Sequence, residues 1–376
     1  MNFYLVAGER SGDLHGGNLI RGLKNLVPNA SFRGFGGDDM QAAGLDLVVH
    51  YRELAFMGIA EVLANLSTIS EKLKQCQQDI TQFKPDVIIL IDYAGFNLRI
   101  AKFAKTRNMR VFWYISPKVW AWNQSRAWKL KANVDRLFVI LPFEKQFFKQ
   151  YSWEVDYVGN PVLDAVKAHQ PDDQFLSRNN FKTSMPLVAL MPGSRKQELR
   201  KIVPMMAAVV AQLPNVQFGL ATVSNLNKNL YNALHNLPNV HVVEGTTYDL
   251  LSHSNAAIVT SGTATLETAL FRVPQVVVYK ANWLNYFIGK LLIRVPFISL
   301  VNLVAEREVV KELIQQEASE ENVLSELKSI LEIKAYRERI EKGYDEIYKV
   351  LDTGSASENT ARLMVEYLQS SNLQIK

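Results

Sequence analysis

The stretch Leu187-Val188-Ala189-Leu190-Met191-Pro192-Gly193-Ser194-Arg195 joins a compact apolar run to a turn of small residues. Such a run predicts a parallel strand that is buried on both faces, and a helical pattern follows the turn. The same layout recurs where Ala256-Ala257-Ile258-Val259 leads through Ser261-Gly262-Thr263-Ala264-Thr265 into a second helical pattern. Strand, turn and helix in this order predict an α/β fold with doubly wound parallel sheets.

Both turns have the composition of phosphate-binding loops. Small residues let backbone N–H groups and the positive end of a helix approach an anion, and Arg195 adds a two-pronged charged donor. Glu267 lies one turn into the second helix, where its carboxylate can accept hydrogen bonds from ribose hydroxyls. The pair of loops therefore predicts a site for a nucleoside diphosphate, although each loop alone fits an ordinary capped helix equally well. The predicted site residues are Gly193, Ser194, Arg195, Ser261, Gly262, Thr263, Ala264 and Glu267.

Composition limits the class of protein. A chain of 376 residues is long enough for two domains, and the single cysteine, Cys76, excludes a disulfide framework and a cysteine-rich metal site. The N-terminus lacks the features of a signal peptide, and charged residues and Pro296 interrupt the longest apolar tract, residues 283–304, so no membrane span is predicted. The net charge of +5 admits sugar nucleotides, phospholipid surfaces or nucleic acid as partners without choosing among them.

Strand-like runs alternate with helical patterns along the whole chain. They are Phe3–Val6, Val87–Ile91, Val111–Ile115, Leu137–Ile140, Leu187–Met191, Val216–Ala221, Val240–Val243, Ala256–Val259 and Gln275–Tyr279. This alternation predicts two Rossmann-like domains that face a cleft. The glycine and proline of Gly159-Asn160-Pro161 interrupt regular structure and mark the domain boundary. This gives an N-terminal domain of residues 1–160 and a C-terminal domain of residues 161–344. A C-terminal helix within residues 345–376 is expected to pack back on the first domain.

Two acidic positions follow predicted strands in the N-terminal half. The loop Ala7-Gly8-Glu9-Arg10-Ser11-Gly12-Asp13 lacks the spacing of a dinucleotide fingerprint, so an NAD site is not expected. Glu9 and Asp13 can hold sugar hydroxyls there, or Asp13 can cap a helix. Asp92 stands at the mouth of a buried strand, where partial desolvation suits a proton acceptor for an alcohol, or where it caps the next helix.

Aromatic and apolar clusters add two ambiguous signals. Four of the six tryptophans lie between Trp113 and Trp128, among cations such as Arg126 and Lys129, and this mixture fits base stacking, a sugar site or a membrane interface. A helical stripe fits either core packing or an edge that dips into a membrane. The stripe consists of Ile59, Val62, Leu63, Leu66 and Ile69.

Taken together, the motifs resemble one family from residue 4 to about residue 315. They are Val6-Ala7-Gly8-Glu9-x-Ser11-Gly12-Asp13, Phe56-Met57-Gly58-x-x-Glu61-Val62-Leu63, Lys84-Pro85-Asp86-Val87, Ile91-Asp92-x-x-x-Phe96-Asn97, Ser116-Pro117-x-Val119-Trp120-Ala121-Trp122, Leu141-Pro142-Phe143-Glu144-Lys145, Gly159-Asn160-Pro161, Pro192-Gly193-Ser194-Arg195, Ser261-Gly262-Thr263-Ala264-x-Leu266-Glu267 and Ser299-Leu300-Val301-Asn302-Leu303. This series resembles the lipid-A-disaccharide synthase family, and the tryptophan motif is its most specific member.

The resemblance implies an inverting glycosyltransferase of GT-B architecture. It would transfer 2,3-diacylglucosamine from its UDP conjugate to the 6-hydroxyl of 2,3-diacylglucosamine 1-phosphate, giving a β-1,6-linked lipid A disaccharide 1-phosphate and UDP. Asp92 is then the expected base, with Glu9 as the second catalytic residue, and Arg195 and Asn302 serve the UDP donor. The expected acceptor residues are Ser11, Asp13, Trp120 and Trp122, and the expected membrane-facing residues are those of the apolar stripe.

The resemblance also implies where the protein works and with what. The expected partners are the two lipid substrates and an inner-membrane lipid surface, with no nucleic acid; a homodimer is left open. The expected location is the cytoplasm, peripheral on the cytoplasmic face of the inner membrane of a Gram-negative-type bacterium. No paired aspartates stand at either phosphate loop and the histidines show no ligand spacing, so transfer without a metal or cofactor is predicted.

Three positions depart from the family pattern, and two rival functions share parts of it. Arg10 replaces a small or hydroxylated residue, Gly95 stands where some members carry a second acid, and Val301 replaces a proline. Gly95 removes an alternative base and so places more weight on Asp92.

The rivals are a non-hydrolysing UDP-N-acetylglucosamine 2-epimerase, which needs no second lipid sugar, and a non-catalytic peripheral membrane module that binds nucleotide.

Overall fold

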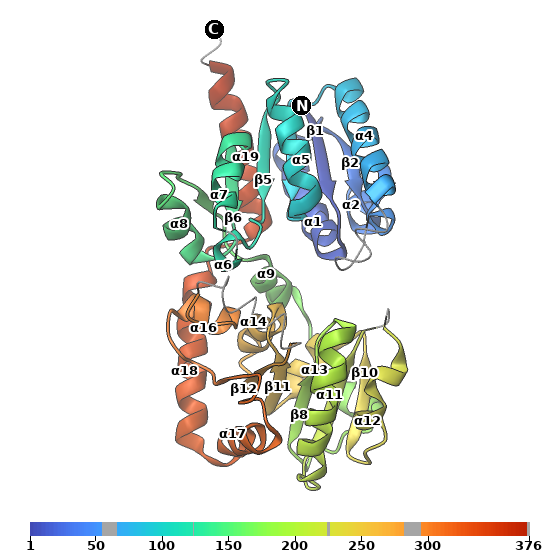
Figure 1. Ribbon diagram of the computed structural model, residues 1–376, viewed down its shortest axis with the longest axis vertical. Helices are drawn as coiled ribbons and strands as arrows, with labels where there is room; N and C mark the ends of the chain where they lie inside the picture. Colours follow the sequence, from blue (N-terminus) through green and yellow to red (C-terminus); the bar gives the residue numbers. More distant parts are fainter. Residues whose placement is uncertain (55–65, 123, 224–225, 282–294, 374–376) are drawn as a thin grey trace. The chain divides into compact units, whose positions relative to one another are not determined.

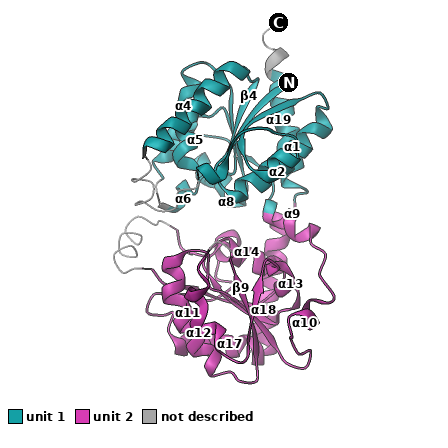
Figure 2. Ribbon diagram, turned by 90° about the vertical axis from the view of Figure 1, so that its right-hand side faces the viewer, with its two compact units in different colours: residues 1–161, 353–376 teal, residues 162–352 magenta. Residues whose placement is uncertain are grey.

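The computed structural model describes residues 1–54, 66–122, 124–223, 226–281 and 295–373 (Figure 1). The chain forms two compact units, which Figure 2 shows in different colours. Unit 1 comprises Met1–Pro161 and Thr353–Lys376, and unit 2 comprises Val162–Asp352. The chain therefore leaves unit 1 at one point and returns to it near its C-terminus.

Unit 1 is built on a parallel sheet in the order β3-β2-β1-β4-β5-β6-β7. Its strands are β1 (Asn2–Ala7), β2 (Ser31–Gly36), β3 (Asp46–His50), β4 (Val87–Ile91), β5 (Val111–Tyr114), β6 (Arg136–Val139) and β7 (Asp156–Tyr157). Its helices are α1 (Arg10–Leu26), α2 (Asp38–Ala42), α4 (Leu66–Phe83), α5 (Ala94–Lys105), α6 (Val119–Trp122), α7 (Arg126–Asn133), α8 (Pro142–Lys149) and α19 (Ala356–Leu373), with a 3₁₀ turn at Tyr51–Glu53. Helix α9 (Pro161–Ala168) begins at the boundary between the units.

Unit 2 repeats this plan with the sheet order β10-β9-β8-β11-β12-β13, again parallel throughout. Its strands are β8 (Leu187–Met191), β9 (Gln217–Thr222), β10 (Val240–Glu244), β11 (Ala256–Thr260), β12 (Gln275–Tyr279) and β13 (Glu312–Ile314). Its helices are α10 (Phe175–Arg178), α11 (Lys196–Ala211), α12 (Asn232–His235), α13 (Thr247–His253), α14 (Thr263–Leu270), α16 (Leu300–Ala305), α17 (Glu320–Glu332) and α18 (Lys334–Leu351), with a 3₁₀ turn at Lys228–Tyr231.

The core of each unit follows from the composition of its central strands. All five residues of β4, Val-Ile-Ile-Leu-Ile, are buried, because helices cover both faces of a parallel sheet. In unit 1, helix α19 packs against α1, and Ala361, Met364 and Leu368 join the same apolar cluster as Leu19 and Leu23. The C-terminal segment is therefore part of the core of unit 1, although more than 190 residues separate it from Pro161.

The structure differs from the sequence-based description at several points. It contains four further strands, β2, β3, β7 and β13, and the segment expected as one C-terminal helix is divided. Helix α18 runs on to Leu351 within unit 2, and α19 starts at Ala356 after a turn through Gly354, whose φ is +87°. None of the helices in the described part of the chain combines the length and apolar composition that crossing a bilayer requires.

Candidate functional site

Each sheet has one point where the strand order reverses direction, and the predicted site loops lie there. In unit 1 the chain builds outward from β1 in one direction and from β4 in the other, and Ala7 of β1 is paired with Ile91 of β4. In unit 2 the corresponding pair is β8 and β11, with Met191 beside Val259. Ligands of doubly wound sheets bind outside the carboxyl ends of the strands at such a point. Each unit therefore has one candidate site, and the two are described separately.

The unit 1 site centres on a strained corner after β4. Asp92 and Tyr93 have φ angles of +43° and +45°, in the left-handed region that residues with a side chain seldom adopt. Such a conformation costs about 1–2 kcal/mol for each residue. Consecutive strained residues persist only where neighbouring contacts enforce them, and such residues gather at functional sites.

Contacts from another loop support this corner. The ring of Tyr93 lies against Gly8, and a Cβ atom at position 8 would collide with the ring. The Tyr93 hydroxyl donates a hydrogen bond of 2.7 Å to the carbonyl oxygen of Leu54. Glycine is therefore needed at position 8 because Tyr93 approaches it closely, which links the loop after β1 to the loop after β4.

The carboxyl group of Asp92 has a perturbed acidity. Burial, together with the nearby charge of Glu9, raises the pKa of Asp92 to about 6, while the Lys118 ammonium opposes the shift. Glu9 is exposed at the start of α1, and its side chain makes no capping hydrogen bond to that helix. A carboxylate with a pKa near 6 is ionised at neutral pH and accepts a proton from an alcohol more readily than an ordinary aspartate.

Asp13 caps a helix, which is one of its two predicted roles, but that helix is not the one that contains it. Its buried carboxylate accepts hydrogen bonds from the backbone N–H groups of Gly37 at 2.7 Å, Met40 at 3.0 Å and Asp39 at 3.1 Å. It therefore caps α2, a helix that begins 25 residues later, instead of the helix that contains it. Ser11, by contrast, is exposed in the first turn of α1.

The tryptophan motif places its members in different surroundings. Trp120 is buried, packs edge-on against Phe143 with ring centroids 5.0 Å apart, and donates from Nε1 to Glu144 at 3.1 Å. Trp122 ends α6, and its side chain lies outside the described part. Trp128 on α7 is 56% exposed. The buried side chain of Trp120 thus supports the segment after β5, which contains the tryptophan motif.

Glu144 is a buried acid to which the sequence analysis assigned no role. Besides the indole of Trp120, its carboxylate accepts the backbone N–H groups of Ile140 at 3.1 Å and Leu141 at 2.9 Å. Burial raises the pKa of Glu144 to about 7, and these donors oppose the shift. The sequence signal was available, because Pro142 and Glu144 occupy the first and third positions of α8, and a glutamate at the third position can accept the backbone N–H of the N-cap residue. Glu144 joins the loop after β5 to the end of β6.

The unit 2 site begins at the loop after β8. Gly193 has a φ of +104°, and a Cβ atom there would lie 2.8 Å from Oε2 of Glu198. The loop ends in Arg195, the N-cap residue of α11, and both Ser194 and Arg195 are exposed. The start of this sixteen-residue helix therefore presents backbone N–H groups and a guanidinium to solvent.

The neighbouring loop after β11 supplies the second wall. Gly262 is the N-cap residue of α14, Thr263 is exposed, and Ser261 donates a hydrogen bond of 2.8 Å to Ile298. Glu267 accepts a hydrogen bond of 3.0 Å from the Tyr248 hydroxyl, and burial raises the pKa of this carboxyl.

Asn302 is fully buried, and its amide is satisfied within the protein. Oδ1 accepts from the N–H groups of Val309 at 2.8 Å and Val310 at 3.1 Å, and Nδ2 donates to Val310 at 2.9 Å and to Glu312 at 3.0 Å. Glu312 also accepts from the backbone of Ile298 and Ser299. Asn302 and Glu312 thus shape the segment beside Ser261, and Glu312 is a residue that the sequence analysis missed.

The predicted membrane-facing stripe is described in part only. Ile59, Val62 and Leu63 lie outside the described residues, as does the side chain of Leu66. Ile69 is 9% exposed and packs inside unit 1, so its side chain is not offered to a lipid surface. Within the described ranges, no group of three or more His, Cys, Asp or Glu side chains could hold a metal ion.

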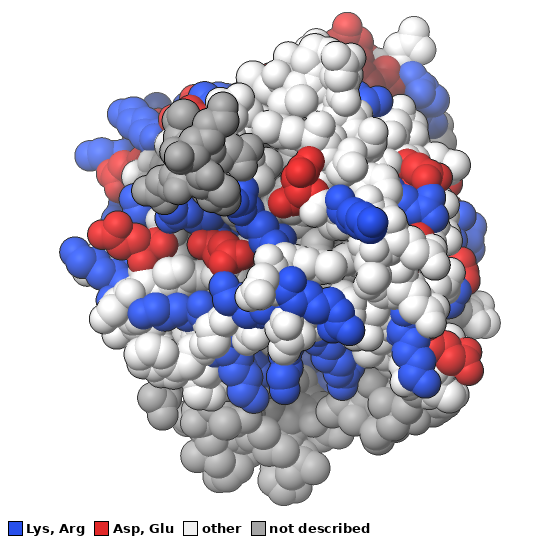
Figure 3. All heavy atoms as spheres, turned by 90° about the horizontal axis from the view of Figure 1, so that it is seen from above, with Lys and Arg blue, Asp and Glu red and all other residues white. Residues whose placement is uncertain are grey.

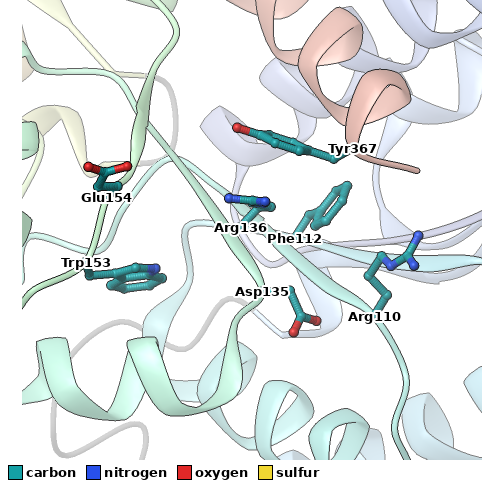
Figure 4. A pocket seen from close by; sticks show the side chains of 7 residues that line it. All are labelled: Arg110, Phe112, Asp135, Arg136, Trp153, Glu154 and Tyr367. Atoms are coloured by element: carbon teal, nitrogen blue, oxygen red, sulfur yellow. The ribbon is translucent and has the colours of Figure 1, made fainter. Parts of the chain in front are cut away.

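A hollow of about 490 Å³ lies at the other, amino-terminal edge of the unit 1 sheet. Arg110 and Asp135, which line this hollow, come immediately before β5 and β6. The guanidinium carbon of Arg136 lies 3.9 Å from the centre of the Tyr367 ring. Figure 4 shows the guanidinium groups of Arg110 and Arg136 pointing in different directions, so these charges do not converge on one ligand. The face seen in Figure 3 carries Lys and Arg side chains with Asp and Glu among them, so its charge is of mixed sign. The carboxyl-edge loops remain the candidate sites.

Comparison with known proteins identifies the family. The family model described as lipid-A-disaccharide synthetase matches residues 3–365. Lipid-A-disaccharide synthase of Syntrophus aciditrophicus (strain SB) is 38% identical over 375 residues, which cover 98% of each chain.

Solved structures with little sequence similarity share the architecture. The UDP-GlcNAc 2-epimerase of Neisseria meningitidis, bound to UDP-GlcNAc, aligns with a TM-score of 0.68 and 14% identity over 98% of this chain and all of the other. The glycotransferase of kitacinnamycin aligns with a TM-score of 0.67 and 14% identity over 98% and 99% of the two chains. At this identity the likeness concerns the fold alone, and it confirms the predicted GT-B architecture. By sequence and by fold, the chain belongs to the lipid-A-disaccharide synthase family of glycosyltransferases.

Proposed function

We propose that this chain joins UDP-2,3-diacylglucosamine to 2,3-diacylglucosamine 1-phosphate. The acceptor 6-hydroxyl oxygen attacks the anomeric carbon of the donor sugar, the bond from that carbon to UDP breaks, and the hydroxyl proton passes to a base. Attack opposite the leaving group inverts the anomeric centre and gives the β-1,6 linkage. The observation that carries the proposal is the corner after β4, which presents Asp92 with a pKa of about 6 at the switch point of unit 1.

In this proposal unit 1 binds the acceptor, with Asp92 as the base. Glu9 lies close enough for its charge to raise the pKa of Asp92, and its exposed carboxylate can hold a sugar hydroxyl. Ser11 is exposed beside it. Asp13 and Trp120 act indirectly, because their polar groups are bonded to α2 and to Glu144. Trp122 retains its predicted place in the acceptor site on sequence grounds.

Unit 2 binds the UDP donor in the same proposal. Arg195 and the first N–H groups of α11 stabilise the diphosphate, and Glu267 accepts a ribose hydroxyl. The turn formed by Ser261, Gly262, Thr263 and Ala264 brings the backbone close to the nucleotide. Asn302 acts through the shape of the neighbouring segment, since all four of its hydrogen-bonding positions are occupied.

Leaving-group stabilisation by N–H groups and Arg195 needs no divalent ion. We therefore expect transfer to continue in excess EDTA at a rate within about twofold of the untreated rate. Complete loss of activity, restored by a divalent cation, would contradict this part of the proposal.

The lipid substrates place the enzyme at a membrane surface. Diacylated sugars reside in a bilayer, so we propose peripheral association with the cytoplasmic face of the inner membrane of a Gram-negative-type bacterium. The apolar sequence positions Ile59, Val62, Leu63 and Leu66 support apolar contact, and the exposed Trp128 beside Lys129 supports contact with anionic headgroups. A homodimer remains compatible with this arrangement.

The reaction is tested by incubating the purified chain with both diacylated substrates and analysing the products by mass spectrometry. We expect equal amounts of UDP and a disaccharide 1-phosphate, with the β configuration seen by NMR. A parallel incubation with UDP-N-acetylglucosamine alone tests the epimerase. An epimeric sugar nucleotide formed without an acceptor, or UDP binding without any turnover, would contradict the proposal.

A further inference from the structure

Asn97 in the first turn of α5 is a buried polar residue that the account so far leaves without a task. Its side chain is completely buried, with 0% exposure. From Nδ2 it donates hydrogen bonds to three backbone carbonyl oxygens, those of Asp92 at 2.9 Å, Ile91 at 3.2 Å and Val6 at 3.4 Å. A single amide group thus forms hydrogen bonds with backbone carbonyls at the ends of two neighbouring strands, β1 and β4.

The chemistry of this contact explains why the residue is an asparagine. Reversing the amide would place its oxygen against three carbonyl oxygens, so the orientation with nitrogen toward them is required. In the described part of the chain, Oδ1 has no hydrogen-bond partner. An apolar side chain of similar size would fill the same volume and avoid burying this oxygen. The bonds to the carbonyls, rather than packing, are therefore the contribution of the amide.

These bonds fix the conformation of residue 92 from both sides. The N–H group of Asp92 donates to the carbonyl oxygen of Tyr114 at 3.1 Å, and its own carbonyl oxygen accepts from Asn97. Between these two anchors lies the left-handed φ of +43°. Without the amide, residue 92 could turn about its N–Cα bond toward an ordinary negative φ, which would relieve the strain and move the carboxyl group.

We propose that Asn97 is a positioning residue for the transfer reaction, which holds the backbone of Asp92 in the conformation that presents its carboxylate. The inference rests on the proposed function, in which Asp92 is the base. Asn97 touches no substrate in this account and acts only through Asp92. Because Nδ2 also reaches Val6 in β1, the same contact sets the end of β4 against the strand that leads to Glu9.

A double-mutant cycle tests this role. We compare the wild type, Asn97→Ala, Asp92→Asn and the double variant for kcat and KM with both diacylated substrates, and for UDP affinity. Misplacing a reacting group by a fraction of an ångström is costly, so Asn97→Ala should lower kcat about tenfold or more and leave UDP affinity unchanged. In the Asp92→Asn background, the same substitution should lower kcat by less than about twofold, because residues that act as a unit are not additive.

Two further variants separate positioning from general destabilisation. Asn239→Ala removes a matched amide in unit 2, whose Nδ2 donates to Leu213 at 3.1 Å and Val216 at 2.9 Å, and should lower the melting temperature without changing kcat. Asn97→Ser retains a donor and should recover part of the lost kcat; if Asn97→Ala does not fold, this variant replaces it in the cycle.

The outcomes are distinguishable. Equal fold-losses in both backgrounds, or a normal kcat in Asn97→Ala, would overturn the positioning role while leaving Asp92 as the base. A normal kcat in Asp92→Asn would overturn the positioning role together with the assignment of the base. A disaccharide product in the wild-type reaction would still support the proposed function in either case.

Discussion

Nη1 of Arg195 donates to Oε1 of Glu198 at 2.6 Å, one turn along α11. The two side chains differ in exposure, with 73% of Arg195 but only 13% of Glu198 open to solvent. Because the guanidinium of Arg195 is largely exposed, it can turn from Glu198 toward a diphosphate, which offers more negative charge. The arrangement keeps Arg195 at the start of the helix where we propose that UDP binds.

Arg195→Ala should therefore weaken UDP binding about tenfold or more, through loss of a charge-assisted contact worth roughly 1.5–3 kcal/mol. Isothermal titration calorimetry with UDP measures the effect. Lys228→Ala is the matched control, because Lys228 is an exposed cation of unit 2 that pairs with Glu244 at 3.5 Å. Equal affinities of Arg195→Ala and the control would remove Arg195 from the donor site.

Asn302→Ala should reduce stability and UDP affinity together. The substitution leaves buried backbone groups and a carboxylate oxygen of Glu312 without their amide partner, which costs about 1–3 kcal/mol. A chemical denaturation curve and a UDP titration of the same sample measure both effects. Lower affinity with unchanged stability would show a direct contact with UDP and would contradict the indirect role proposed for this residue.

Gly95→Asp tests the position where some family members carry a second acid. A Cβ atom at Gly95 would meet nothing within 4 Å, so the aspartate should fold with a melting temperature within about 2 °C of wild type. Its negative charge, three residues from Asp92, should raise the pKa of that group above about 6 and move the acid limb of the kcat profile to higher pH. An unchanged acid limb in the folded variant would contradict the assignment of that limb to Asp92.

The membrane proposal predicts different effects for two sets of substitutions in one sequence stripe. Val62→Ser with Leu66→Ser should lower vesicle flotation and activity on long-chain substrates, while the melting temperature stays near that of wild type. Ile69→Ser is the internal control, because that side chain is 9% exposed and its replacement should lower the melting temperature sharply. If the double variant melts as early as Ile69→Ser and still floats with vesicles, the stripe belongs to the core.

Much of the fold could be predicted because its central strands are uninterrupted apolar runs. Val87–Ile91 and Leu187–Met191 were expected at the bounds that the structure has. Strand β2 was missed because Arg33, Gly34 and Gly36 break its apolar pattern. The glycine is required there, since a Cβ atom at position 34 would collide with the carbonyl oxygen of Leu5 in β1. Strands β7 and β13 contain two and three residues, too few for any periodicity.

The positions of Asp92 and Arg195 could be predicted, because each lies in the loop that follows a central strand. The site could not be predicted where a side chain bonds to a distant segment. Asp13 caps α2 across 24 residues of sequence, and Asn302 meets Glu312 from another element. Local spacing carries no information about such partners, because only the folded sheet brings them together.

The pH dependence of kcat, measured for the wild type and for Asp92→Asn with both diacylated substrates, tests the central claim most directly. The base works only when ionised, and a pKa of about 6 means that kcat of the wild type should be level near neutral pH and fall about tenfold per unit below pH 6. Asp92→Asn should be about 10²-fold slower, lose that acid limb and bind UDP as before. A folded Asp92→Asn variant with nearly wild-type kcat and the same acid limb would show that another group accepts the proton.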